Sequence, residues 1–132
     1  MTELEKVREF FKGDVYATLT TGAVIEEIGD RYSKCSLALG TQHKNAAEQV
    51  MGGAIFTLAD FAFAVATNRP DTPITVTLST NISFVGTVKG NTIFAQTRLV
   101  KDGRRNCFYE VKVTDDLGNL VAIVNVVGAH LN

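Results

Sequence analysis

One acidic side chain interrupts the most apolar stretch of the sequence. Asp60 lies within residues 51–67, which read MGGAIFTLADFAFAVAT and hold no other charged side chain. A carboxylate buried without partners is strongly destabilising, so an acid kept there is either satisfied by hydroxyls such as Thr57 or Thr77, or used in chemistry. Apolar surroundings also raise the pKa of a carboxylic acid, which suits it to act as a general base near neutral pH. Asp60 is therefore the first candidate for a catalytic residue.

Two glycines, Gly52 and Gly53, stand at the beginning of the same stretch. The first N–H groups of a helix have no partner within the helix, and they lie at the positive end of its dipole. Such amides can stabilise the oxyanion that forms when a carbonyl is attacked, and glycine lets the carbonyl approach the backbone closely. Gly52 is thus the candidate oxyanion hole and Gly53 a candidate substrate contact. The alternative is a helix that needs close packing at its first turn.

The spacing between these groups predicts a dimer. Eight residues separate Gly52 from Asp60, which is about 12 Å at the helical rise of 1.5 Å per residue. The two groups therefore cannot act on one carbonyl from the same subunit. A two-fold dimer with the two helices side by side and antiparallel would bring Gly52 of one chain opposite Asp60 of the other.

Two helices are expected from local patterns. Residues 51–67 predict a buried core helix, which is too short and too interrupted to span a membrane. Residues 2–12 predict an amphipathic helix, in which Thr2 and Glu5 form a capping box. The apolar face of this first helix is formed by Leu4, Val7, Phe10 and Phe11.

The remaining segments predict strands and one functional loop. Residues 15–39 predict two strands, and residues 40–50 predict a loop that delivers polar side chains to the core helix. Residues 74–85 alternate cleanly, with an apolar side made of Ile74, Val76, Leu78, Ile82 and Phe84. Three more strands, separated by turn signals, are expected at 92–101, 104–115 and 120–131. This order predicts an α+β domain in which a twisted antiparallel sheet, ending in a four-strand meander, wraps around the core helix.

Composition narrows the classes of function. The chain has 132 residues, and we expect residues 1–132 to form a single domain. Thirteen basic and fourteen acidic residues nearly balance, so neither a nucleic acid nor a membrane is the expected partner. No basic segment precedes an apolar run at the N-terminus, which predicts a cytoplasmic protein with Cys35 and Cys107 reduced. The two cysteines and two histidines lack zinc-motif spacing, so the sequence predicts no metal site.

Three short motifs follow one another along the chain. Residues 43–53 read HKNAAEQVMGG, residues 57–60 read TLAD, and residues 81–84 read NISF. This series resembles the PaaI-like group of hotdog-fold acyl-CoA thioesterases, in which a loop His-x-Asn-x-x-Gly-x-x-His-Gly-Gly leads to Thr-Leu-Ala-Asp and then to Asn-Ile-x-Phe. The resemblance covers about residues 15–131. It implies a hotdog fold, an antiparallel twisted sheet wrapped around a long central helix, here with a short N-terminal helix added.

The resemblance also implies catalytic roles. It makes Asp60 the base or nucleophile, Asn45 an amide that orients water or the carbonyl, and Thr77 a hydroxyl near the acid. Two family positions differ in this sequence. Glu48 replaces the loop glycine, and Met51 replaces the histidine before Gly-Gly, so the side chain at 51 cannot titrate or hydrogen-bond as histidine does.

A second group of residues is expected to contact the substrate. These candidates are Gly53, His43, Met51, Arg104 and Arg105. The two arginines lie near a predicted hairpin turn, as do Lys89 and Lys101, and basic groups there suit the phosphates of coenzyme A.

Together these features predict an acyl-CoA thioesterase that works as a homodimer or a dimer of dimers. Coenzyme A enters as part of the substrate, and no separate cofactor is expected. One alternative is a non-catalytic acyl-CoA or acyl-carrier binding module, in which Glu48 and Met51 mark lost or redirected chemistry. Another is a different hotdog enzyme such as a hydratase, which is disfavoured because a paired catalytic Asp and His is missing.

Overall fold

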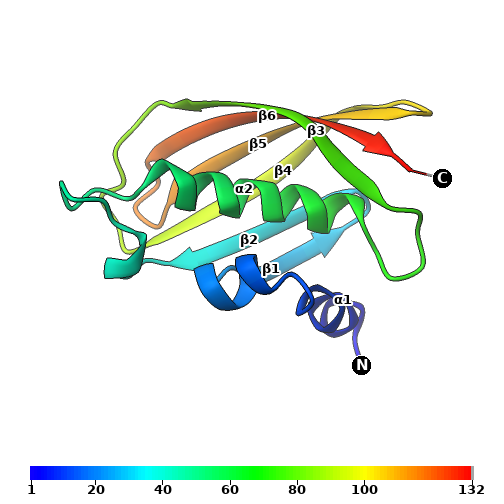
Figure 1. Cartoon of the computed structure of the whole chain (residues 1–132), viewed down its shortest axis with the longest axis horizontal. Helices are drawn as coiled ribbons and strands as arrows, with labels where there is room; N and C mark the ends of the chain where they lie inside the picture. The colour runs from blue at the N-terminus through cyan, green and yellow to red at the C-terminus, as the bar shows by residue number, and fades with distance from the viewer. Residues whose placement is uncertain (132) are drawn as a thin grey trace.

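Six antiparallel strands form one twisted sheet that curves around a long helix (Figure 1). The computed structural model describes residues 1–131. The strands are β1 (Val24–Gly29), β2 (Tyr32–Ala38), β3 (Thr75–Phe84), β4 (Thr92–Asp102), β5 (Asn106–Asp115) and β6 (Leu120–His130). The helical segments are α1 (Glu3–Phe11), the π-helical turn η1 (Tyr16–Thr21), the 3-10 turn η2 (Thr41–His43) and α2 (Gly52–Thr67). The predicted α+β fold, with the sheet wrapped around the core helix, is confirmed.

The strand order is β1-β2-β4-β5-β6-β3, which makes β3 an edge strand. The prediction of a meander of four consecutive strands was wrong for its first strand, because β3 pairs with β6 while β4 pairs with β2. Residues 85–91 carry the chain from one edge of the sheet to its interior. There β4 pairs with β2 on one side and β5 on the other, and it buries Ile93 and Ala95 completely.

The helix α2 lies across the concave face of the sheet and forms the centre of the core. Leu58, Ala59 and Ala62 are fully buried, and the small alanines let the helix approach the strands closely. The Ser33 hydroxyl of β2 donates a hydrogen bond to the Ala62 carbonyl at 2.6 Å. Within residues 1–131, no helix combines the length and the apolar character needed to cross a membrane.

The first predicted strand begins later than its pattern suggests. A strand is expected from residue 15, whereas the structure has the turn η1 there and β1 begins only at Val24. In η1 Ala17 and Thr21, four residues apart, are buried, while Leu19 is 79% exposed. The buried residues of this segment therefore follow a helical spacing. Gly22, with φ of 96°, ends the turn in a left-handed conformation that favours glycine.

A bulge in β3 changes which side chains face α2. The register with β6 shifts directly after Thr77, so that Leu78 is the extra residue. Before the bulge Thr75 and Thr77 face inward, and after it Phe84 does, because Thr77 reaches Asp60 and Phe84 lies against Gly52. The prediction of one apolar side running from Ile74 to Phe84 was therefore wrong. The bulge leaves Leu78 59% exposed on the outer side.

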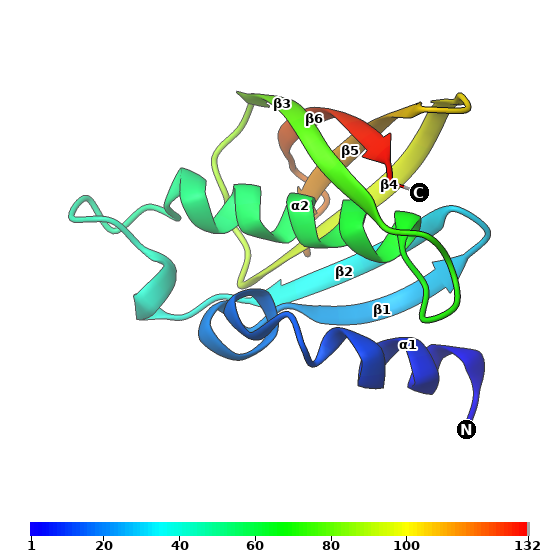
Figure 2. The ribbon, with the colours of Figure 1, turned by 45° about the vertical axis from the view of Figure 1, so that its right-hand side comes forward.

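The helix α1 lies against β1, at the opposite side of the molecule from β3 (Figure 2). Its N-cap is the predicted one, since the Thr2 hydroxyl accepts a hydrogen bond from the Glu5 N–H at 3.1 Å. Val7 and Phe11 are buried as expected. Phe10 is 48% exposed, because it lies beside the buried stripe of α1 and not within it.

Gly128 in β6 occupies a position too crowded for a side chain. A Cβ atom there would lie 2.7 Å from Phe63 Cζ and 2.9 Å from Cys107 Sγ. We expect Gly128→Ala to lower the free energy of unfolding by about 1–3 kcal/mol, because overpacking forces the neighbours to shift. Urea unfolding measures this, with Gly13→Ala as the control, since the nearest contact there is an ordinary 3.6 Å. Equal stability of the two variants would contradict the crowding.

Candidate active site

Asp60 lies midway along α2 and is held by a hydroxyl from the neighbouring strand. The Thr77 Oγ1 atom of β3 donates a hydrogen bond to Asp60 Oδ1 at 3.1 Å. Thr77 faces inward with Thr75, two residues before it, and the register shift of β3 comes only after Thr77. The structure thus brings together two of the residues predicted for catalysis.

The carboxylate of Asp60 lines a cavity of about 400 Å³. The wall is built by the outward side of α2 and by residues 14–17, and it includes the apolar side chains Val15, Ala17, Phe56, Phe61 and Ala64. Asp14 is the second acid in this wall. The cavity therefore places a carboxylate beside apolar walls, as small-molecule binding sites commonly do.

Burial sets the acidity of Asp60. It raises the pKa of Asp60 above the ordinary value for aspartic acid, and the hydrogen bond from Thr77 opposes part of that rise. The pKa of Asp14 is also raised, first by burial and then by the negative charge of Asp60. A carboxylate with a raised pKa accepts a proton more readily, which is what a general base requires.

The Thr77 hydrogen bond gives a testable pH dependence. Activity that needs ionised Asp60 falls as the pH drops through the pKa of Asp60. Thr77→Val removes the contact that lowers this pKa, so the acid limb of the rate profile should move to higher pH. A hydrogen bond to a charged group is worth about 1.5–3 kcal/mol, so we expect a roughly tenfold loss at the pH where the wild type is half active.

Measuring kcat/KM against pH for both proteins tests this expectation. Thr80→Val, a change two residues beyond the bulge on the same strand, serves as the control and should leave the limb in place. If the pH profile of Thr77→Val superimposed on that of the wild type, Thr77 would not influence the pKa of the catalytic acid.

The first turn of α2 presents two free amides. The Met51 carbonyl accepts hydrogen bonds from the N–H groups of Ala54 and Ile55. Within the described chain, residues 1–131, the N–H groups of Gly52 and Gly53 have no hydrogen-bond acceptor. Gly52 also lines a second cavity of about 330 Å³. The predicted oxyanion donors are thus available at the helix terminus.

Close packing also requires Gly52. A Cβ atom at this position would lie 2.8 Å from Phe84 Cζ, whereas a Cβ at Gly53 would contact nothing closer than 4.0 Å. The packing interpretation of the glycine pair therefore applies at Gly52, and oxyanion binding there stays a prediction. Packing does not explain Gly53.

The loop before α2 holds its two predicted polar residues in different ways. The His43 ring is buried, its Nδ1 accepts a hydrogen bond from the Gly40 N–H at 3.0 Å, and its Nε2 lies 2.7 Å from the Thr21 carbonyl. This leaves no ring nitrogen for the predicted contact with substrate, so His43 fastens the loop to η1. Asn45 is exposed, and its Oδ1 accepts from the N–H groups of Ala47 and Gln49, which leaves only its Nδ2 group to face a substrate.

Glu48 occupies the position where the family motif has glycine, and its backbone explains that preference. Its φ is 60°, in the left-handed region that glycine adopts most easily. The same turn is therefore formed here without glycine, at some cost in strain.

The remaining predicted residues lie apart from Asp60 within one chain. Met51 is exposed beside the free amides of α2. Arg104 and Arg105 are exposed in the turn between β4 and β5, and Arg104 lines a cavity with Thr67 at the other end of α2. A single subunit therefore does not bring the arginines to the Asp60 carboxylate.

Asp14 is the residue of this site that the sequence did not reveal. It directly precedes residues 15–39, whose pattern predicts strands, and an acid before an apparent strand is an ordinary surface residue. Its place in the cavity wall depends on η1 folding back over α2, a tertiary contact without a local signal.

Comparison with known proteins agrees with this architecture. A family model described as the thioesterase superfamily matches residues 49–122, more than half of the chain. A curated relative from Archaeoglobus fulgidus, which carries a provisional esterase name, is 27% identical over 122 residues, which cover 91% of this chain and 78% of the relative.

Solved structures show the same fold at low identity. The Escherichia coli PaaI protein of the phenylacetic acid degradation operon aligns with a TM-score of 0.86 at 18% identity, covering 99% of this chain and 97% of that one. A hypothetical thioesterase of Streptococcus pneumoniae, solved with coenzyme A, aligns with a TM-score of 0.83 at 19% identity, covering 92% and 97%. A Haemophilus influenzae thioesterase aligns with a TM-score of 0.87 at 14% identity, covering 100% and 92%. The hotdog fold predicted from the sequence is thereby confirmed.

Proposed function

The chain belongs to the thioesterase superfamily, and on that premise we propose that it hydrolyses acyl-coenzyme A thioesters at sites shared between two subunits. The observation that carries the proposal is the pair of Asp60 and Thr77, a carboxylate held by one hydroxyl in the wall of an apolar cavity. The raised pKa of that carboxylate suits proton transfer near neutral pH.

In the proposed reaction Asp60 either takes a proton from the attacking water or attacks the thioester carbonyl itself. The negative charge that develops on the carbonyl oxygen is stabilised by the free N–H of Gly52, aided by the positive end of the α2 dipole. When water attacks, Asp60 passes the proton that it took to the departing thiolate, and collapse of the intermediate gives coenzyme A as a thiol and the carboxylic acid. When Asp60 attacks, collapse leaves an anhydride between Asp60 and the acyl group, and water then hydrolyses this anhydride to the carboxylic acid and free Asp60. The Nδ2 group of Asn45 would orient the water or the carbonyl. A carboxylate and backbone amides suffice for these steps, so the proposed reaction uses no separate cofactor.

The two halves of this machinery lie in different cavities, which supports the dimer. Asp60 lines the cavity of about 400 Å³, and Gly52 lines the separate cavity of about 330 Å³ near the beginning of the same helix. With two α2 helices antiparallel about a two-fold axis, the Asp60 cavity of one subunit would face the Gly52 cavity of the other. Two identical composite sites would result, and pairing of such dimers would give a tetramer.

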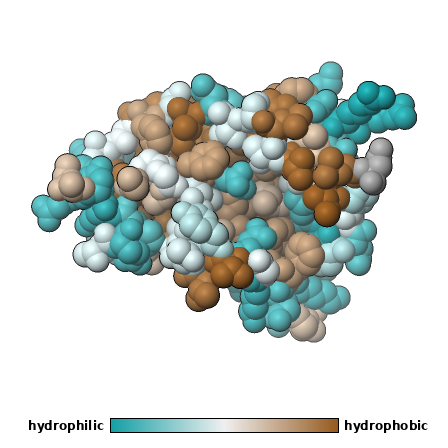
Figure 3. All heavy atoms as spheres, in the orientation of Figure 1, coloured by the Kyte–Doolittle hydropathy of each residue, from teal (hydrophilic) through white to brown (hydrophobic). Residues whose placement is uncertain are grey.

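Apolar surface on one face of the chain agrees with such an interface. In Figure 3 the brown spheres form separate groups, several of which lie along the upper and right-hand parts of the view, where β3 runs in Figure 1. The exposed apolar side chains on and beside β3 are Ile74, Val76, Leu78, Phe84 and Val85. An apolar edge strand without charged residues to protect it is a typical site for pairing with another chain.

The proposed substrate class is a coenzyme A thioester. The Streptococcus pneumoniae relative of the same fold was solved with coenzyme A. In the antiparallel dimer the end of α2 would lie beside residues 40–50 of the partner subunit, which would move Arg104 and Arg105 toward the partner's helix terminus. Their charges would there suit the phosphates of coenzyme A.

A thiol-release assay against a panel of aliphatic and aromatic acyl-CoA thioesters tests the proposal. We expect turnover of at least one member, with free coenzyme A and carboxylic acid formed in equal amounts. Tight binding of acyl-CoA without turnover would refute hydrolysis and favour the alternative of a non-catalytic binding module.

A further inference from the structure

A separate cavity of about 330 Å³ lies at the end of α2 that is remote from Gly52. Its wall is formed by the last turn of α2, the beginning of β3, the hairpin of β4 and β5, and the end of β6. Three different metal-ligand types meet in this wall, namely a carboxylate, a thiol and an imidazole. They belong to Asp102, Cys107 and His130, none of which takes part in the proposed hydrolysis.

The sheet register places these three side chains together. Asp102 at the end of β4 is paired with Cys107 near the start of β5. On its other side, Cys107 is paired with Gly128 of β6, two residues before His130. One ligand atom from each side chain, including Cys107 Sγ, lies within 4.8 Å of the others, and His130 Nε2 is 2.7 Å from Asp102 Oδ1. Because the residues come from three strands, their spacing in the sequence gives no metal motif.

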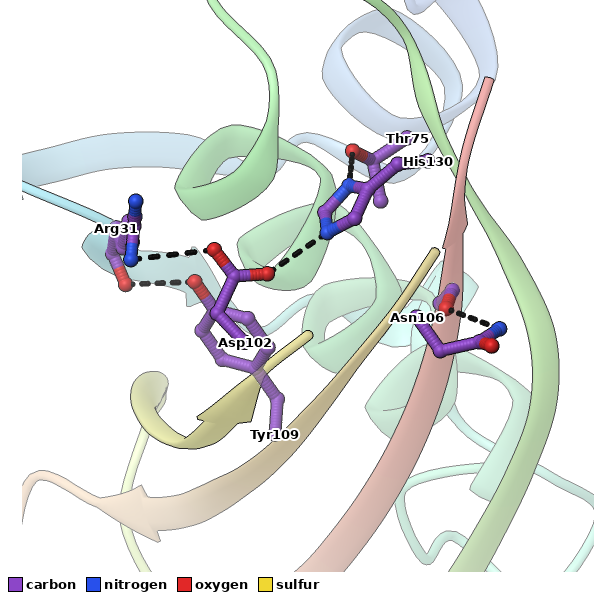
Figure 4. Close-up of polar contacts among 7 residues, drawn as sticks. Arg31, Thr75, Asp102, Asn106, Tyr109 and His130 are labelled. Atoms are coloured by element: carbon purple, nitrogen blue, oxygen red, sulfur yellow. Dashed lines mark hydrogen bonds and ion pairs between the residues drawn. The ribbon is translucent and has the colours of Figure 1, made fainter. Parts of the chain in front are cut away.

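A further contact fixes each of the two polar ligands from behind, as Figure 4 shows. The Thr75 hydroxyl lies 2.8 Å from His130 Nδ1, and the Arg31 guanidinium lies 3.1 Å from Asp102 Oδ2. These contacts engage the outer atoms of both side chains and leave His130 Nε2 and Asp102 Oδ1 directed at each other. Second contacts of this kind orient the ligands in protein metal sites, and a hydroxyl can hold the ring in either tautomer.

From this geometry we propose that Asp102, Cys107 and His130 bind a divalent cation of the zinc class, with a fourth position open to the cavity. Zn²⁺ takes thiolate, imidazole and carboxylate together in tetrahedral geometry, at about 2.3 Å from sulfur and about 2.0–2.2 Å from nitrogen or oxygen. The separation of Nε2 and Oδ1, now 2.7 Å, then opens by about 0.7 Å to admit the ion in tetrahedral geometry. A site with three protein ligands and an open fourth position leaves room for water or a small anion to bind the metal.

The local charges fit a cation of this kind. A thiolate and a carboxylate balance the two positive charges of the ion, so the neutral group tolerates Arg31 on its outer side. Mg²⁺ and Ca²⁺ prefer sites made of oxygen ligands, and the buried Cys107 sulfur disfavours them. The ligand set therefore selects a borderline metal such as Zn²⁺.

Titration of chelator-treated protein with Co²⁺ tests the site directly, because a bond between Co²⁺ and thiolate gives a charge-transfer band in the near ultraviolet. We expect one equivalent of Co²⁺ to bind and to give this band, and we expect Zn²⁺ to displace the bound Co²⁺. Cys107→Ser should abolish the band. Cys35→Ser should keep it, since Cys35 is the other buried thiol and lies beside Ser33, away from the cavity.

Two further variants probe the polar side of the site while leaving the thiol in place. Asp102→Asn removes a charged ligand, and Thr75→Val removes the contact behind His130; we expect Thr75→Val to weaken Zn²⁺ binding about 10-fold to 100-fold.

Wild-type protein should also unfold about 5–10 °C higher at a hundredfold excess of Zn²⁺ over its Kd. A wild-type titration without the charge-transfer band, or a band that survives Cys107→Ser, would overturn the proposal. Both readouts measure metal binding and not turnover, so their outcome is independent of the proposed hydrolysis.

Discussion

Asp60→Asn should lower the turnover of an acyl-CoA substrate at least about a hundredfold while leaving the fold intact. Asparagine has nearly the same size and can still receive the hydrogen bond from Thr77 that Asp60 Oδ1 now accepts at 3.1 Å. It cannot take a proton from water or attack a carbonyl. The same change also removes a carboxylate that burial destabilises, so the free energy of unfolding should stay equal or rise.

Steady-state thiol release measures the loss, and urea unfolding checks the fold. Asp71→Asn, an exposed change in the loop after α2, is the matched control and should retain full activity. Asp14→Asn in the same cavity separates the two acids. It removes a negative charge beside Asp60, so it should leave most of the activity. Turnover that survives Asp60→Asn, or that disappears with Asp14→Asn instead, would refute the assignment of the base.

The sequence predicted those parts of the fold that depend on local chemistry. The core helix is recognisable because a helix that is apolar on nearly all sides must be buried by the rest of the chain. The N-cap at Thr2 is recognisable because a hydroxyl before an amphipathic helix can accept a hydrogen bond from a free N–H of the first turn. The hairpin of β4 and β5 follows from its turn residues Asp102 and Gly103. None of these features requires knowledge of a distant contact.

The errors all concern contacts between distant segments. The partner of β3 is set by the crossing of residues 85–91, and the inner side of β3 is set by the bulge at Leu78. The turn η1 forms where Ala17 and Thr21 can be buried together. The same residues alternate between apolar and polar types as they would in a strand. A pattern with period 2 cannot show a one-residue shift that occurs partway along the strand.

The same division holds for the candidate site. Asp60 is visible as a charge among apolar residues, and Thr77 follows from the resemblance. Their hydrogen bond depends on the packing of β3 against α2, which has no local signal. His43 is a candidate substrate contact because it lies in the loop before α2, whereas its two ring nitrogens are engaged with Gly40 and Thr21. Asp14 was missed because only the folding of η1 over α2 brings it to the cavity.

Lysine substitutions on the edge strand β3 should dissociate the proposed dimer and also lower the rate of thioester hydrolysis. Val76 and Leu78 are exposed on β3, and the double variant Val76→Lys/Leu78→Lys would set like charges against their symmetry mates near a two-fold axis. Each half-site would then lose the Gly52 amide of the other subunit. Removing one oxyanion donor costs about 10²–10³ in kcat, so we expect a loss of at least about a hundredfold.

Light scattering after size-exclusion chromatography gives the oligomeric state, and thiol release gives the activity of the same fractions. The matched control is Val24→Lys/Val100→Lys, which charges two other exposed valines, Val24 at the opposite edge of the sheet and Val100 on β4. The control should stay dimeric and active, because its charges lie away from β3. A charged β3 variant that is monomeric and fully active would show that one subunit contains the whole site. The 12 Å that the helical rise places between Gly52 and Asp60 would then have to be bridged by a donor other than the α2 terminus.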